Sequence, residues 1–364
     1  MRRGAHLALL LAGAATSVAA QEPTRRAVQL RIEVRTEIEG AELGHSVVSI
    51  PELGLERFVG AGAVVVLLVP PGPAHLVVKR LGYYPKDTTI LVSDAPSQVV
   101  TIVLALLSVR LGAVQVADWP PCLDPGLPRA DTDPVGRSVV EQLRQNAERY
   151  RLLERSYPFI YAFERSFGRR TLEGLEVVER TDTSASSSQP NWSYKPGTLV
   201  RVRRRALSRA NDEYAMRIPS LRDISDPTFI ANHCFHLAGI EDKGGQRLVR
   251  LDIVAAEALK EPDVNIAAWL DSADFRLRAA TFHLTRIPPV LANLQRVTNE
   301  VFYLEVIPFV PVHYSITAER LEKDSNGAQR IHVERQLVLD VRFTGAVPDG
   351  VSQAPVPAPR RRRP

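Results

Sequence analysis

The feature that most constrains this fold is a strict alternation of apolar and polar residues near the start of the chain. Every second position from Val28 to Val34 is apolar, and each is followed by a Gln, Arg or Glu side chain. Because successive side chains of a strand point to opposite faces, this period of two predicts a strand with one buried face. Short runs rich in Val, Ile and Leu continue as far as Leu106, separated by Gly and Pro. These runs, roughly six or seven in number, predict an antiparallel β-sandwich.

Two turns in this region carry a resemblance to a known family. Pro70-Pro71-Gly72 precedes one strand, and Gly82-Tyr83 turns the chain before a strand at Thr88–Val92. This order resembles the bacterial carboxypeptidase regulatory-like domain over about residues 27–117. The resemblance implies a seven-stranded, transthyretin-like β-sandwich. The sequence departs from the family pattern at Leu53-Gly54-Leu55, where an Asp-Gly or Asn-Gly hairpin is usual.

One helix and a second β-rich region are expected after the sandwich. The prolines of residues 118–134 predict a stiff linker, and apolar residues three or four apart predict a helix over Val135–Arg155. Extended patterns dominate the rest of residues 135–345, while Ser184–Ser188 is predicted to be a flexible loop. The expected fold class is therefore mainly β, with a larger curved antiparallel sheet and the helix against its concave face. Residues 346–364, rich in Pro and Arg, predict a disordered tail.

Short motifs in the second region carry a weaker resemblance. The motifs are Asp226-Pro227, His233-Cys234-Phe235 and Ala268-Trp269-Leu270-Asp271 with Leu277-Arg278. They resemble the downstream region of envelope proteins that carry the regulatory-like sandwich. The expected architecture is also similar, more distantly, to half-barrel folds that hold lipids or lipoproteins. Likeness of architecture alone is weak ground for function.

The N-terminal segment has the layout of an export signal. Arg2 and Arg3 precede an apolar run from Leu7 to Val18, and Ala20 ends a group of small residues. A membrane anchor is the alternative, but spanning a bilayer takes about 20 apolar residues. The pattern therefore predicts a signal peptide over residues 1–20 and an exported protein of the periplasm or cell envelope. No later apolar run is long enough to span as a helix, so we expect no transmembrane segment in the mature chain.

The two cysteines, Cys122 and Cys234, form one even pair in a chain predicted to reach an oxidising compartment. A disulfide is therefore expected, with two unpaired buried thiols as the alternative. His233 and His236 flank Cys234 and are weak candidates for a metal site. In an extended strand His233 and Cys234 face opposite sides, so we expect no metal here and a structural role for both histidines.

Signatures of catalysis and of nucleotide cofactors are absent from the sequence. None of the eight histidines has a Glu three residues later, as a zinc carboxypeptidase site requires. The chain also contains no G-x-S-x-G, P-loop or G-x-G-x-x-G pattern, so no cofactor and no catalytic residue are predicted. The net charge of +5 comes from arginines near the two termini, so no nucleic-acid partner is predicted.

These observations favour a non-catalytic, exported envelope protein that binds an unknown envelope protein, a glycan or a lipid-like ligand. A carbohydrate-binding protein is one alternative, for which Tyr84, Trp192 and Tyr194 are the candidate contact aromatics. A hydrolase with its site in the second domain is another. The basic run from Arg201 to Arg209 is a candidate contact with an anionic surface.

Overall fold

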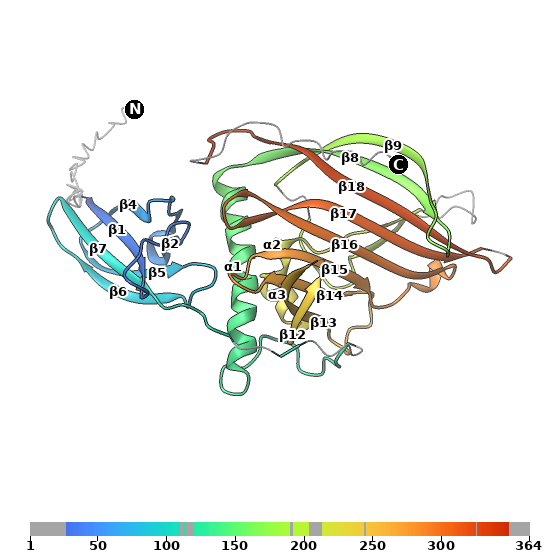
Figure 1. Cartoon of the computed structure of the whole chain (residues 1–364), viewed down its shortest axis with the longest axis horizontal. Helices are drawn as coiled ribbons and strands as arrows, with labels where there is room; N and C mark the ends of the chain where they lie inside the picture. Colours follow the sequence, from blue (N-terminus) through green and yellow to red (C-terminus); the bar gives the residue numbers. More distant parts are fainter. Residues whose placement is uncertain are drawn as a thin grey trace, which may run out of the picture.

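The computed structural model describes residues 27–109, 112–113, 119–189, 192–203, 213–243, 245–324 and 326–348. The predicted signal peptide lies outside the described residues, as does the predicted tail from residue 349 onward. Within the described part of the chain, none of the helices has the length and hydropathy needed to cross a membrane. The fold is mainly β, as the sequence predicts (Figure 1).

The N-terminal domain is a seven-stranded sandwich. Its strands are β1 (Val28–Thr36), β2 (Val47–Ile50), β3 (Leu55–Phe58), β4 (Val64–Val69), β5 (Gly72–Lys79), β6 (Lys86–Val92) and β7 (Ser97–Leu104). They form two sheets, in the orders β4-β1-β7 and β3-β2-β5-β6, with β1 parallel to β7 and the other pairs antiparallel. The alternating apolar residues of β1 are almost completely buried between the sheets. The predicted sandwich is therefore confirmed.

The loop between β2 and β3 contains the sequence Leu53-Gly54-Leu55. Pro51–Leu53 forms one turn of 3-10 helix, and Gly54 ends it in the left-handed conformation, with φ of 61°. Its N–H donates to the carbonyl of Pro51. Glycine adopts this conformation without the steric cost that a Cβ imposes, so the chain still reverses into β3 without an Asn-Gly pair.

Helix α1 (Pro134–Ser156) stands between the sandwich and the large sheet (Figure 1). It begins after Asp133, whose carboxylate accepts a hydrogen bond of 2.8 Å from the N–H of Gly136, and Pro134 occupies the first helical position. Both features stabilise a helix start, because they leave fewer backbone N–H groups without a partner. The predicted helix is confirmed to within one residue at each end.

The second domain is built on one nine-stranded antiparallel sheet. Its strands are β8 (Phe159–Arg170), β9 (Glu176–Ser187), β12 (His233–Lys243), β13 (Gln246–Ala255), β14 (Val264–Asp271), β15 (Leu277–Leu284), β16 (Leu294–Ile307), β17 (Val310–Lys323) and β18 (Gln329–Phe343). The order is β12-β13-β14-β15-β16-β17-β18-β8-β9. The β8–β9 hairpin, which comes first in the sequence, therefore pairs with the last strand.

The segment Ser184–Ser188 is not a flexible loop, and that prediction is wrong. Ser184 to Ser187 end β9 and pair with β8, and the hydroxyl of Ser188 accepts a hydrogen bond from the N–H of Phe159. A Ser-rich segment has weak local preference for a strand, but pairing with a long neighbouring strand satisfies its backbone and overrides that preference.

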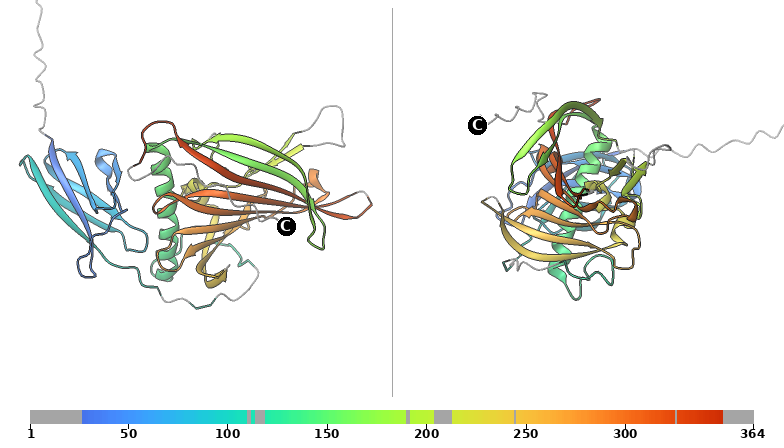
Figure 2. Two further views of the ribbon diagram at one scale, coloured as in Figure 1. Left: turned by 45° about the horizontal axis from the view of Figure 1, so that its top comes forward. Right: turned by 90° about the vertical axis from the view of Figure 1, so that its right-hand side faces the viewer.

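One face of the large sheet is covered by the connecting segments. The hairpin β10 (Val200–Arg203) and β11 (Glu213–Met216) and the short helices α2 (Leu221–Ile224) and α3 (Pro227–Ile230) join α1 on this face. Figure 2 shows the strands curving around α1, so this is the concave side. Apolar residues of α1 and of β12 to β16 form the largest core cluster between them. The expected position of the helix is therefore confirmed.

The sandwich docks onto the opposite side of α1. The side chain of Gln142 accepts a hydrogen bond of 2.8 Å from the N–H of Gly82 and donates one of 3.2 Å to the carbonyl of Tyr83. The guanidinium of Arg80 lies 3.5 Å from the ring centroid of Phe309, which belongs to the β16–β17 turn. The helix thus bonds to the sandwich on one side and packs into the sheet on the other.

Candidate functional site

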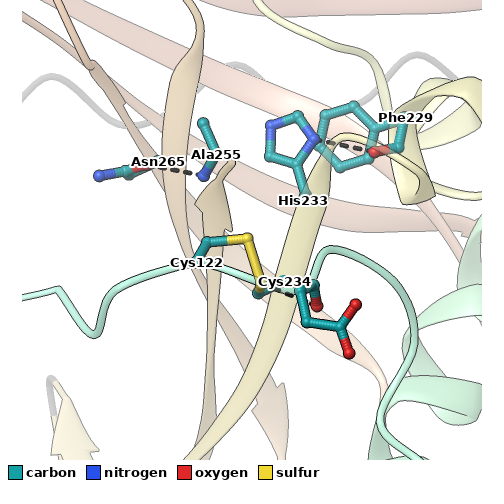
Figure 3. The surroundings of a disulfide bond; sticks show 7 residues. Cys122, Phe229, His233, Cys234, Ala255 and Asn265 are labelled. Carbon is teal, nitrogen blue, oxygen red and sulfur yellow. Dashed lines mark hydrogen bonds between the residues drawn. A yellow bond between two sulfur atoms is a disulfide. The ribbon is translucent and has the colours of Figure 1, made fainter. Parts of the chain in front are cut away.

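The predicted disulfide between Cys122 and Cys234 is present (Figure 3). It joins the connector before α1 to the start of β12, with a Cα–Cα distance of 5.5 Å. The bridge packs against Val254, Ala256 and Trp119. It therefore closes the connector onto the edge of the large sheet and takes Cys234 out of any metal site.

His233 lies on the other side of β12, as the alternation of the strand predicts. Its ring stacks on Phe229, with 3.8 Å between centroids, and its Nδ1 lies 2.9 Å from the carbonyl oxygen of Phe229 (Figure 3). The other ring nitrogen faces the buried carboxylate of Asp263 at 3.4 Å, and Tyr194 donates its hydroxyl to the same carboxylate at 2.5 Å. His233 has no exposed surface, so it is a structural residue that joins α3 to the sheet.

His236 is only half-buried, and burial lowers its pKa below the usual value. Among the residues that the structure describes, no group of three or more His, Cys, Asp or Glu side chains is placed to hold a metal ion. The two histidines therefore do not converge on one site.

The three candidate contact aromatics differ in how exposed they are, and they do not all lie in the same domain. Tyr194 is buried in the core of the second domain, so its ring offers no face to a ligand. Trp192 is partly buried against the same core, with the guanidinium of Arg217 5.5 Å from its ring centroid. Tyr84 belongs to the sandwich and is exposed. Of the basic run, Arg201 is exposed on β10, and residues 204–209 lie outside the described residues.

A cleft of about 750 Å³ opens on the concave side of the large sheet, and it is the best candidate for a binding site. Strands β8, β9, β16, β17 and β18 supply its wall, and β11 with the residues after it lies over it. The lining residues are Arg165, Phe167, Arg180, Met216, Ile218, Val297, Asn299, Ile316, Ala318, Arg320, Glu334 and Gln336. They come from segments far apart in the sequence, which the sheet order places side by side.

A carboxylate stands at the centre of the polar part of the cleft. Glu334 accepts hydrogen bonds at one oxygen from Nε and Nη2 of Arg165, at 3.1 and 2.7 Å, and from the side-chain amide of Gln336 at 2.9 Å. Its other oxygen accepts from Nη2 of Arg320 at 3.4 Å. The Glu334 side chain is 13% exposed, so it is held largely out of water by these donors.

Phe167 organises two of the cleft arginines. The guanidinium of Arg180 lies 4.2 Å from its ring centroid, and that of Arg165 lies 4.9 Å from it. The negative face of an aromatic ring attracts cations, so Phe167 keeps both positive groups near one place. Arg180 also approaches the carboxylate of Asp182 at 3.5 Å, near the solvent.

The remaining wall of the cleft is apolar. It is formed by Met216, Ile218, Val297, Ile316 and Ala318. The amide of Asn299, the polar residue among them, donates to the sulfur of Met216 at 3.6 Å. The cleft therefore has a charged side on β8, β9 and β18, to which Arg320 of β17 also contributes, and an apolar side on β16, β17 and the covering segment.

The sequence did not predict this cleft. The alternating residues of β17, which place Ile316, Ala318 and Arg320 on one face, were the available signal. Alternation shows which residues share a face, but it does not show that β8 and β9 join β18 across the sheet.

No family model matches this chain, and no curated protein matches it. Three solved structures align with part of it, each over 58% of this chain and 95% of the other. The first is a DUF1329 family protein from Desulfovibrio piger, with 14% sequence identity and a TM-score of 0.30. The second is a putative outer membrane lipoprotein-sorting protein domain from Vibrio parahaemolyticus, with 12% identity and a TM-score of 0.29. The third is a LolA superfamily protein from Nitrosomonas europaea, with 11% identity and a TM-score of 0.29. Similarity at this level supports no conclusion about function, which rests on the residues of the cleft.

Proposed function

We propose that this chain is an exported, non-catalytic binding protein of the cell envelope, and that its second domain holds a lipid-like amphiphile in the concave cleft. The division of the cleft wall into an apolar side and a charged side carries this proposal. An apolar chain gains about 0.8 kcal/mol for each methylene that it buries, whereas a polar head needs hydrogen-bond partners. The cleft offers both surfaces next to each other.

The size of the cleft supports the same proposal. Small-molecule sites have volumes of about 300–1,000 Å³ and combine mostly apolar walls with a few convergent polar groups. At about 750 Å³, with Arg165, Arg320 and Gln336 converging on one corner, the cleft fits this description. Its ligand is therefore expected to be a single small amphiphile.

The chemistry of the lining residues favours binding over catalysis. Nucleophilic catalysis needs a Ser, Cys or Thr beside a general base. The described residues that line the cleft include none of these nucleophiles and no His, and the carboxylate of Glu334 is bonded to two arginines. Both oxygens of this carboxylate already accept hydrogen bonds, and the described lining holds no nucleophile beside it that it could activate.

The sandwich contributes rigidity in this proposal. We infer from its turns and its seven strands that it is a carboxypeptidase regulatory-like domain, acting as a structural module. Its attachment to α1 through Gln142 supports a fixed position beside the binding domain. No zinc peptidase activity is part of the proposal.

Export is tested directly by the N-terminus of the native protein. The disulfide supports an oxidising compartment, because such bridges are rare in the cytosol. We expect N-terminal sequencing of the protein recovered from the envelope fraction to begin at Gln21. A native product that retains residues 1–20 would contradict export by this route.

Ligand binding is tested with the neutral fluorophore N-phenyl-1-naphthylamine, whose emission rises in apolar surroundings. We expect saturable binding to delipidated protein, weakened about tenfold or more by Ala318→Trp, which fills the cleft. Thr317→Trp is the matched control, because the neighbouring side chain of β17 points to the opposite face. Circular dichroism and thermal unfolding show whether each variant is folded. Equal binding by the two folded variants would refute the proposed site.

A further inference from the structure

We propose that the ligand of the cleft carries an anionic phosphate or carboxylate head, which Arg165, Arg180 and Arg320 bind in partial exchange for Glu334. This inference rests on the proposed function, because it names the class of amphiphile that the same cleft takes.

The charge balance of the lining favours an anion. Three guanidinium groups line the cleft against the single carboxylate of Glu334, which leaves an excess of two positive charges. Asp182, which lies 3.5 Å from Arg180, is outside the lining. A negative head is therefore favoured over a neutral or cationic one, and the low dielectric of a partly enclosed site strengthens that preference.

The arginines present donors beyond those that Glu334 occupies. A guanidinium carries five N–H donors, and Arg165 directs Nε and Nη2 to Glu334, which leaves Nη1 for a ligand. Arg180 is well exposed, and its contact with Asp182 is an ion pair of 3.5 Å. Arginine forks match the oxygens of carboxylates and phosphates, so an incoming anion finds geometry that suits it.

The carboxylate of Glu334 occupies the place that a ligand anion would take. It lies between Arg165 and Arg320, on adjoining parts of the cleft wall, and is supported by Gln336. In the unliganded protein this carboxylate neutralises the buried faces of the two arginines. A ligand head that binds them must compete with Glu334, so removing the charge of Glu334 should strengthen binding.

Phe167 and the sheet order give the ligand a direction. The ring holds Arg165 and Arg180 together at the β8–β9 side, while Val297 and Ile316 lie on β16 and β17. The order β16-β17-β18-β8-β9 therefore sets the head toward β8 and β9, with Arg320 of β17 at its border with the apolar side, and the chain toward β16. This orientation lets the head contact Arg165 and Arg180 while the chain contacts the apolar side of the wall.

The test compares ligands that share one alkyl chain. Decyl phosphate, decanoate, decanol and decyltrimethylammonium compete with N-phenyl-1-naphthylamine, each below its micelle-forming concentration. We expect decyl phosphate and decanoate to displace the probe at concentrations about tenfold lower than decanol does, with decyltrimethylammonium the weakest. The tenfold preference corresponds to one charge-assisted contact.

Three variants connect the preference to the arginines. Arg165→Gln and Arg180→Gln should remove most of the difference in affinity between decyl phosphate and decanol. The concentration of decanol that displaces the probe should stay the same. Glu334→Gln should have the opposite effect and raise the affinity for decyl phosphate severalfold. Arg169→Gln is the control, because Arg169 belongs to the same strand but is not among the residues that line the cleft, and it pairs with Glu179. Arg180 is exposed, so its variant is expected to fold even where Arg165→Gln does not.

The outcomes separate this inference from the proposed function. If the probe binds in the cleft but decyl phosphate and decanol compete equally, the anionic head is refuted and the amphiphile site stands. If Ala318→Trp leaves probe binding intact, the proposed function itself fails. Inorganic phosphate alone is tested last. If it stabilises the folded protein as much as decyl phosphate does, and if this effect depends on Arg165, the cleft is a site for a free anion. That result would overturn the requirement for an alkyl chain.

Discussion

The guanidinium of Arg149, in the middle of α1, donates a hydrogen bond of 2.8 Å from Nη1 to the backbone carbonyl of His45 in the sandwich. Its Nη2 donates to the carbonyl of Lys79 at 3.3 Å, and only 2% of the residue is exposed. Burial, reinforced by the positive charge of Arg80, lowers the pKa of Arg149 to about 9. A buried cation bonded to two carbonyls therefore fixes the junction between the two domains.

Replacing Arg149 should loosen this junction. Arg149→Ala leaves the carbonyls of His45 and Lys79 without their donor and opens a cavity, at a combined cost of about 2–4 kcal/mol. Urea unfolding should show a lower midpoint, and limited proteolysis should cleave the connector faster. Arg151→Ala, on the exposed side of the same helix, should change stability by less than about 0.5 kcal/mol. Equal effects of the two substitutions would show that the junction does not depend on Arg149.

Glu154 predicts a dependence of stability on pH. One of its oxygens is buried without a hydrogen-bond partner, the other lies 3.9 Å from Arg222, and burial raises its pKa from 4.5 to about 6. Between these values the folded state keeps a proton that the unfolded state has released, so stability falls as pH rises through the window. Glu154→Gln removes this cost and should stabilise the protein by about 1–2 kcal/mol at pH 8.

The comparison that decides this prediction is made at two pH values. Below pH 4.5 the glutamate is protonated in both states, so the variant should gain little there. Unfolding midpoints of the two proteins at pH 4 and pH 8 provide the measurement. A gain of the same size at both values would mean that the substitution acts through packing instead of charge.

The sequence predicts those parts of this fold that depend on local pattern. The alternation of β1 predicts a half-buried strand because burial requires one face to be apolar, and the spacing of Val139, Val140 and Leu143 predicts α1 for the same reason. The disulfide follows from the even pair of cysteines. By contrast, the cleft depends on the pairing of β18 with β8, over more than 150 intervening residues. Nothing local specifies that pairing, so Arg165 and Glu334 cannot be brought together from sequence alone.

Tyr194 should matter for stability and not for ligand contact. Its hydroxyl donates to Asp263, whose other oxygen accepts from the N–H of Val264 at 2.8 Å. Burial and the bond to Asp263 both raise the pKa of Tyr194, so the hydroxyl stays protonated and keeps donating. Tyr194→Phe leaves a buried carboxylate oxygen without its donor and should cost about 1–3 kcal/mol. Tyr84→Phe, at an exposed ring, is the control and should unfold at the same urea concentration as the natural protein.

The disulfide should stabilise the second domain by restricting the unfolded chain. Cys122 and Cys234 are 112 residues apart, and closing a loop of that length contributes up to about 4–5 kcal/mol in the chain-entropy model. The bridge also holds the connector beside β12, where the N–H of Gly126 bonds to the carbonyl of His233 at 2.9 Å. We therefore expect reductant to lower the urea midpoint of the natural protein, and Cys122→Ala with Cys234→Ala to lower it similarly. Reductant should have no effect on the double variant; a midpoint that still falls would show that it acts elsewhere than on this bridge.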